Sequence, residues 1–94
     1  MSVTAVVLIN ARGASLNSLA ESLAEVPAVT EVFSVAGRYD LVAIVRAERN
    51  EDLPDIVNGR MRTVVGEFIS ETLIAFRVYR RSDVDAGFSL GVED

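Results

Sequence analysis

The chain has 94 residues and a formal net charge of −5, and half of its residues are hydrophobic. This length suits one domain, and the high apolar content indicates that a partner covers part of the surface. Cysteine and histidine are absent, which excludes disulfides, thiolate metal sites and the commonest general base. The sequence has no clustered basic face, secretion signal or membrane-spanning run. We therefore expect a cytoplasmic protein with no metal, no cofactor and no direct nucleic-acid contact.

The first half of the chain predicts a strand, a helix and a hairpin. Val3–Ile9 is a nearly continuous apolar run rich in β-branched residues, which is typical of a strand buried on both faces. Apolar residues at helical spacing predict a helix over 15–25, which Pro27 ends. Strands over 29–36 and 41–45 follow, and because only four turn residues separate them, they predict a hairpin.

The second half predicts one more helix and one more strand. Asn50 is a plausible helix N-cap, Pro54 fits the first turn, and apolar residues mark one helical face as far as Val64. A long strand is predicted over 68–79. We expect residues 1–79 to form the domain. Residues 80–94 are expected to be a tail that packs on the domain or on a neighbouring subunit, with Phe88 and Leu90 as its anchors.

The element order β-α-β-β-α-β matches the ferredoxin-like α+β fold, an antiparallel sheet with both helices on one face. The other face of such a sheet should be polar if it meets water. Yet the first strand is apolar on both sides, with Val7 and Ile9 on one and Val6 and Leu8 on the other. We therefore predict a dimer of the α+β barrel type, formed face to face and burying on the order of 1,200–2,000 Å². The alternative is a tail folded over this face.

The residue types present predict a protein that is not an enzyme. Nucleophilic catalysis needs a nucleophile beside a base, and the chain has no histidine, cysteine or lysine. Glu21 and Glu25 lie on a predicted helix surface, where solvation explains them. Two polar stretches remain, the turn 37–40 and residues 70–72 at the start of the last strand. Each is equally well explained as plain structure, with Asp40 bonding to nearby amides, or as part of a ligand site.

Three motifs in the sequence resemble those of the Lrp/AsnC effector-binding domain, also called the RAM domain. Residues 29–32 and 35–41 are similar to its V-x-E-V and V-T-G-x-Y-D-L motifs, and residues 66–72 to its G-V-x-x-T-x-T motif. The departures are Ala36 for Thr, Glu67 for Val and Ser70 for the first Thr. Because the chain starts at the first strand, it resembles stand-alone members of the family, without the helix-turn-helix domain.

This resemblance implies a homodimer that assembles into a tetramer or octamer and binds a small-molecule effector, an amino acid, between dimers. It also implies an accessory role in transcription regulation, with full-length Lrp/AsnC regulators as possible partners. Asp40 would accept from the α-ammonium group, Arg38 or amides near Gly37 would hold the carboxylate, and two hydroxyls would orient the ligand. The candidate ligand-binding residues are Gly37, Arg38, Tyr39, Asp40, Ser70 and Thr72.

Three alternatives remain open at this point. An ACT-like amino-acid-binding domain has the same element order, and residues 11–16 resemble its glycine-containing loop after the first strand. A small dimeric α+β barrel enzyme is disfavoured by the missing histidine. A structural oligomer without a ligand is the third.

Overall fold

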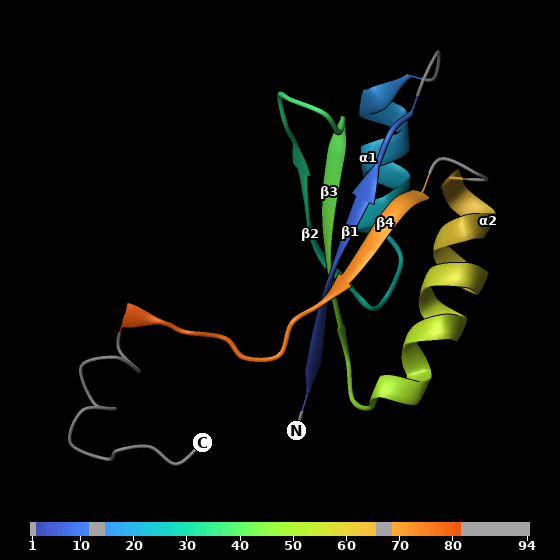
Figure 1. Ribbon diagram of the computed structural model, residues 1–94. Coiled ribbons are helices and arrows are strands. Elements are labelled where there is room, and N and C mark those ends of the chain that lie inside the picture. The colour runs from blue at the N-terminus through green and yellow to red at the C-terminus, as the bar shows by residue number, and fades with distance from the viewer. Residues whose placement is uncertain (1, 12–14, 66–68, 82–94) are drawn as a thin grey trace.

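The structure is a computed structural model that describes residues 2–11, 15–65 and 69–81. It has two layers, a four-stranded sheet and a layer of helices on one side of it (Figure 1). The elements in chain order are β1 (Val3–Ile9), α1 (Leu16–Ala24), β2 (Val29–Ser34), β3 (Leu41–Ala47), η1 (Asn50–Asp52), η2 (Asp55–Met61), α2 (Arg62–Val65) and β4 (Ile69–Ile74).

The strands lie in the order β2-β3-β1-β4, and every neighbouring pair is antiparallel. The two most continuously apolar strands, β1 and β3, are central and stay in register from Val3 opposite Ala47 to Ile9 opposite Leu41. This order and these connections confirm the predicted ferredoxin-like βαββαβ fold.

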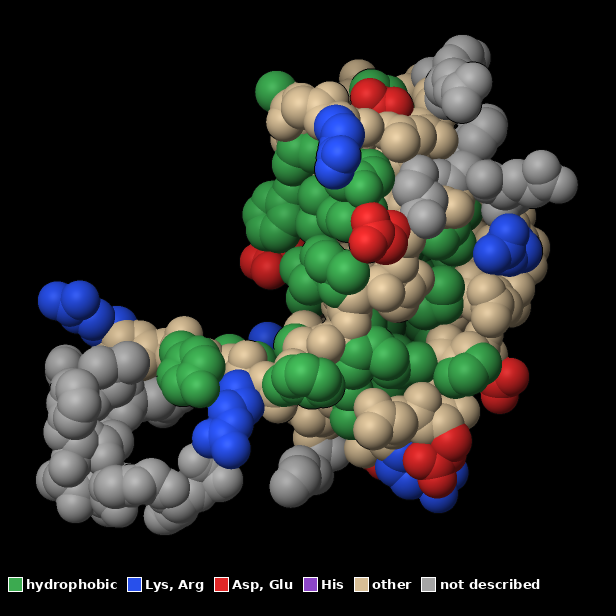
Figure 2. All heavy atoms as spheres, in the orientation of Figure 1, with side chains coloured by type: hydrophobic (Ala, Val, Ile, Leu, Met, Phe, Trp, Pro, Cys, Tyr) green, Lys and Arg blue, Asp and Glu red, His purple; other side chains and the backbone are tan. Residues whose placement is uncertain are grey.

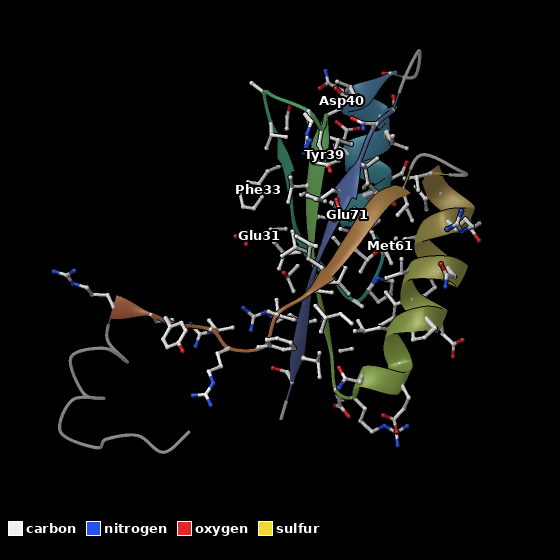
Figure 3. All side chains as sticks on the ribbon, in the orientation of Figure 1. Glu31, Phe33, Tyr39, Asp40, Met61 and Glu71 are labelled. Atoms are coloured by element: carbon white, nitrogen blue, oxygen red, sulfur yellow. The ribbon has the colours of Figure 1, made fainter. Side chains whose placement is uncertain are left out.

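The core lies between the sheet and the helices. Alternate residues of β1, namely Ala5, Val7 and Ile9, are completely buried there. The helices contribute Leu23 from α1 and Met61 from η2, both fully buried as well, and Figure 3 shows Met61 on the helical side of the sheet. Of the two apolar sides of the first strand, the one with Val7 and Ile9 therefore faces the helices.

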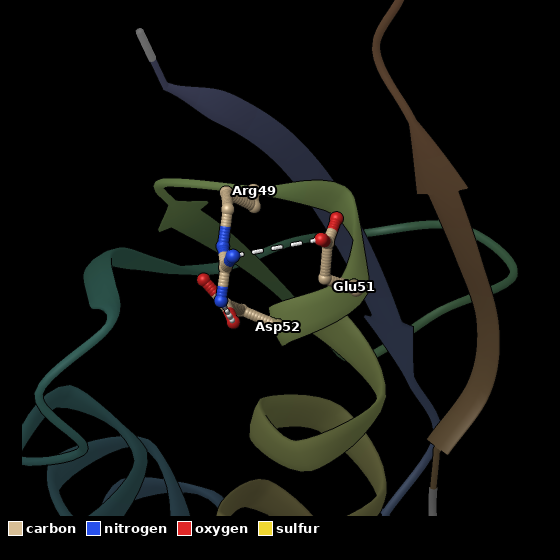
Figure 4. Close-up of polar contacts among 3 residues, drawn as sticks. All are labelled: Arg49, Glu51 and Asp52. Atoms are coloured by element: carbon tan, nitrogen blue, oxygen red, sulfur yellow. Dashed lines mark ion pairs between the residues drawn. The ribbon is translucent and has the colours of Figure 1, made fainter.

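The second helical region differs from the single helix predicted from Asn50 onwards. It consists of a 3-10 turn (η1), a π-helical segment (η2) and a short α-helix (α2). The prediction of Asn50 as N-cap is wrong, because Arg49 occupies the cap position and no side chain caps the turn. Arg49 instead pairs with Glu51 at 3.7 Å and Asp52 at 3.6 Å (Figure 4). Such exposed pairs stabilise a protein by at most about 1 kcal/mol.

The last strand is shorter than the predicted range of 68–79. Strand β4 ends at Ile74, opposite Ala5, because its partner β1 begins only two residues earlier, at Val3. One more bond follows, from the Ala75 amide to the Thr4 carbonyl at 2.9 Å. Residues 75–81, called the arm below, then run outward on the side of the sheet opposite the helices (Figure 1). Residue 68 and the predicted tail beyond 81, with Phe88 and Leu90, lie outside the described residues.

The face of the sheet away from the helices is apolar, as the two-sided pattern of the strands predicts. Two of its side chains, Phe33 and Leu73, are 46% and 47% exposed. Figure 2 shows hydrophobic side chains gathered over this region. This surface, called the open face below, consists of Val6, Leu8, Phe33, Val42, Ile44 and Leu73. No described element of the chain covers it.

Candidate functional site

The turn between β2 and β3 is held in a conformation that requires glycine. Gly37 has φ +127°, a backbone conformation that residues other than glycine rarely adopt. No atom lies within 4 Å of the position that a Cβ would take. The backbone angle, and not lack of space, therefore explains the glycine. The Val35 amide donates to the Asp40 carbonyl at 3.0 Å and closes the turn.

Asp40 ties this turn to the end of β1. Its amide donates to the Ile9 carbonyl at 2.9 Å, and its Oδ2 accepts from the Ala11 amide at 3.0 Å. The interpretation of Asp40 as a residue that bonds to nearby amides is therefore confirmed for one carboxylate oxygen. Asp40 is partly buried. Its two hydrogen bonds hold the turn at a defined position beside the end of β1.

Tyr39 connects the turn to the last strand. Its hydroxyl donates to Oε1 of Glu71 on β4 at 2.9 Å. Because Glu71 lies opposite Leu8, and β1 separates β3 from β4, this pair crosses β1 on the side of the open face (Figure 3). The hydrogen bond to Glu71, desolvation and the Glu71 charge raise the pKa of Tyr39, and the Arg38 charge partly opposes them. Tyr39 is thus a neutral donor at neutral pH.

The two remaining candidates lie on β4. Thr72 is exposed and lies opposite Val7, so its side chain leaves the sheet on the other face from Glu71. Ile69 pairs with Ile9 and Glu71 with Leu8, so the backbone of Ser70 lies in a β-bulge. This bulge interrupts the regular pairing of β4 with β1 between Ile69 and Glu71.

The two predicted stretches therefore meet through the hydrogen bond between Tyr39 and Glu71. Within the described residues, Asp40 and Thr72 are not hydrogen-bonded to each other. Sequence reasoning missed Glu71 as a site residue. The signal that could have found it is an acid at an open-face position of β4, in a row otherwise occupied by Phe33, Val42 and Leu8.

The chemistry of this end of the sheet suits binding of a small polar molecule. It offers two carboxylates, from Asp40 and Glu71, a neutral phenol and the exposed guanidinium of Arg38. These groups could accept from an ammonium group and donate to a carboxylate. Among residues 2–11, 15–65 and 69–81, no three acidic side chains gather as a metal site would require. Nor is any helix in these ranges long and apolar enough to cross a membrane.

The fold is that of a ferredoxin-like α+β module, and the polar groups at one end of its sheet form a candidate ligand site. Residues 4–84 match the model of the Lrp/AsnC ligand binding domain, so the chain belongs to this family. The predicted resemblance is confirmed. Its relatives include PH1916 of Pyrococcus horikoshii, an uncharacterised HTH-type transcriptional regulator, at 36% identity over 64 residues. That match covers 68% of this chain and 43% of PH1916, so the chain spans less than half of this relative.

Two solved structures have the same fold at similar length. TTHA0845 from Thermus thermophilus is 47% identical, with a TM-score of 0.72, and the match covers 84% of this chain and 99% of that one. The protein FFRP-DM1 is 29% identical, with a TM-score of 0.68, and the match covers 79% of this chain and 99% of that one. The curated relatives are named as transcriptional regulators and not as enzymes.

Proposed function

We propose that this chain binds a small-molecule effector, an amino acid, and acts in the cytoplasm as an oligomeric, non-enzymatic accessory of transcription regulation. The family match and the names of the relatives support the regulatory role. The observation that carries the proposal is the hydrogen bond from Tyr39 to Glu71, because it joins two family-like motifs at one end of the sheet. Gly37, Arg38, Tyr39, Asp40, Ser70 and Thr72 remain the proposed ligand-binding residues, and we add Glu71.

Each proposed contact uses a group of known chemistry. Asp40 uses Oδ2 to hold the Ala11 amide, so its other oxygen would accept from the α-ammonium group. Arg38 or the amides near Gly37 would bind the carboxylate by charge-assisted hydrogen bonds. Thr72 leaves the sheet on the other side from Glu71. Because the two residues lie on opposite faces, a ligand would touch Glu71 of one copy and Thr72 of another, in keeping with binding between dimers.

The proposed assembly begins with a dimer through the open face. Large exposed apolar areas on a small protein are typical of interaction surfaces, and Phe33 and Leu73 are nearly half exposed. Dimers would then associate into a tetramer or octamer. Full-length Lrp/AsnC regulators are the proposed partners, and DNA would be contacted by them and not by this domain.

Isothermal titration of the purified chain with the common amino acids tests the effector proposal. We expect one of them to bind, and Asp40→Asn to weaken it by about tenfold or more, which corresponds to about 1.4 kcal/mol. This variant keeps an oxygen for the Ala11 amide but loses the charge, so it separates the ligand role of Asp40 from its structural role. Thr72→Ala should weaken binding less.

The control is Asp55→Asn, which makes the same chemical change on an exposed helical residue and should leave binding unchanged. If the wild type binds an amino acid and both Asp40→Asn and Thr72→Ala bind it equally well, the site lies elsewhere. If no amino acid binds, the proposed effector class is wrong.

A further inference from the structure

Glu71 places a carboxylate among the apolar side chains of the open face. It lies opposite Leu8 on β1, and its side chain is exposed. Its Oε1 accepts from the hydroxyl of Tyr39 at 2.9 Å, but a phenol is neutral, so this bond does not balance the negative charge. Among the described residues, the arm included, no cationic side chain pairs with Glu71. The carboxylate can therefore receive a cation from outside the chain.

Two carboxylates reach this end of the sheet from opposite sides of β1. Asp40, beside the start of β3, donates its amide to the Ile9 carbonyl, whereas Glu71 of β4 lies opposite Leu8. Because β1 lies between β3 and β4, the two backbones are about two strand spacings apart, roughly 10 Å. The side chains can close part of this span, and Figure 3 shows Tyr39 between the two acids. A ligand with two cationic groups joined by a short flexible chain suits this arrangement.

The charges at this end of the sheet exceed those that a simple amino acid needs. Every amino acid has one α-ammonium group and one carboxylate, which the proposed function assigns to Asp40 and to Arg38 or the amides near Gly37. The pKa of Tyr39 is raised, chiefly by Glu71, and the charge of Arg38 opposes this rise, so the guanidinium acts on the same phenol. Glu71 is then a second acid that the backbone groups of an amino acid do not match.

We propose that Glu71 selects an effector with a cationic side chain, a basic amino acid of the lysine type, and this inference rests on the proposed effector site. The α-ammonium group would bind Asp40, and the side-chain ammonium group would reach Oε2 of Glu71. The flexible four-carbon stem of lysine would lie along Leu8, while the ring of Tyr39 attracts the cation. An uncharged side chain would leave the carboxylate unmatched beside apolar surface, and an acidic one would meet a like charge.

Isothermal titration of the full chain with L-lysine and L-norleucine tests this inference, because norleucine is lysine without the terminal ammonium group. We expect the wild type to bind lysine at least about tenfold more tightly, as a charge-assisted hydrogen bond allows. Glu71→Gln keeps an oxygen for the Tyr39 hydroxyl but loses the charge, so the two affinities should come within about threefold of each other. Glu21→Gln makes the same change on an exposed part of α1 and should keep the preference.

Glu71→Lys gives a second test, which a purely structural role of Glu71 would not pass. Because it puts a cation in place of the acid, it should reverse the preference, so that L-glutamate binds more tightly than L-lysine. The inference is wrong if the wild type binds norleucine as tightly as lysine, or if Glu71→Gln keeps the preference for lysine. In both cases an amino acid still binds, and the effector proposal stands. If none of the common amino acids binds, the effector proposal itself fails, and this inference fails with it.

Discussion

The two faces of the sheet are built from alternate residues of the same strands, yet they end in different environments. On the helical side, Val7 and Ile9 are fully buried. Their neighbours in sequence, Val6 and Leu8, point to the open face and stay partly accessible. The first side explains how one chain folds, whereas the second is apolar without a described element to cover it. A strand that is apolar on both sides, in a sheet with helices on one side, thus indicates a partner.

The largest expected change in stability comes from substituting two isoleucines that lie on opposite faces of the sheet. Ile9→Ala leaves a cavity in the core and should lower the free energy of unfolding by about 2–5 kcal/mol at every protein concentration. Ile44→Ala should act mainly at concentrations where the chain is oligomeric, because it removes surface from the interface. Urea unfolding at two widely separated protein concentrations measures both. Equal losses in dilute solution would show that the open face belongs to the intrachain core.

A smaller change in stability is expected when two glycines, each with room for a Cβ atom, are compared. Gly37→Ala should lower the free energy of unfolding by about 1–3 kcal/mol, since φ +127° strains any other residue. Gly59→Ala should raise it by about 0.4–1 kcal/mol, because Gly59 lies inside the second helical region with an ordinary φ. Thermal unfolding of the two variants beside the wild type gives the signs. Two losses of equal size would contradict a conformational role for Gly37.

The smallest expected effect concerns the hydrogen bond between Tyr39 and Glu71 beside the open face. Glu71→Gln should lower the pKa of Tyr39 toward its ordinary value of about 10, because the carboxylate that disfavours the phenolate is removed. In the wild type the raised pKa means that the contribution of this pair to stability is present below about pH 10 and is lost as the pH rises through the folded-state pKa. Ultraviolet titration in a Tyr79→Phe background, where Tyr39 is the only phenol, measures it. An unchanged pKa in Glu71→Gln would contradict the hydrogen bond.

The sequence predicts the sheet well because strand identity depends on local pattern. The bounds of β1 follow directly from its β-branched run. The end of β4 does not, since alternation continues to Tyr79 but pairing stops at Ile74, opposite Ala5 near the start of β1. Likewise, helical spacing finds the apolar face of the second helical region but not its π-helical segment, which changes only the hydrogen-bond pattern of the backbone.

The candidate site is also predicted only in part, because local patterns show its turn but not its long-range contacts. The glycine turn is visible locally, because Gly and Asp suit turns. The bonds that give the site its shape join residues far apart in the chain, Tyr39 with Glu71 and Asp40 with Ala11. Such contacts arise from the sheet order, so local patterns could not show them. Glu71 is an ordinary strand residue until the fold places it beside Tyr39.

Native mass spectrometry of the freshly purified protein over a dilution series tests the central claim most directly, because it gives the subunit count and any retained small molecule together. The account predicts an even-numbered homo-oligomer built from dimers, with a bound mass in the range of an amino acid. A chain that is monomeric at all concentrations, with its open face in water, would contradict it.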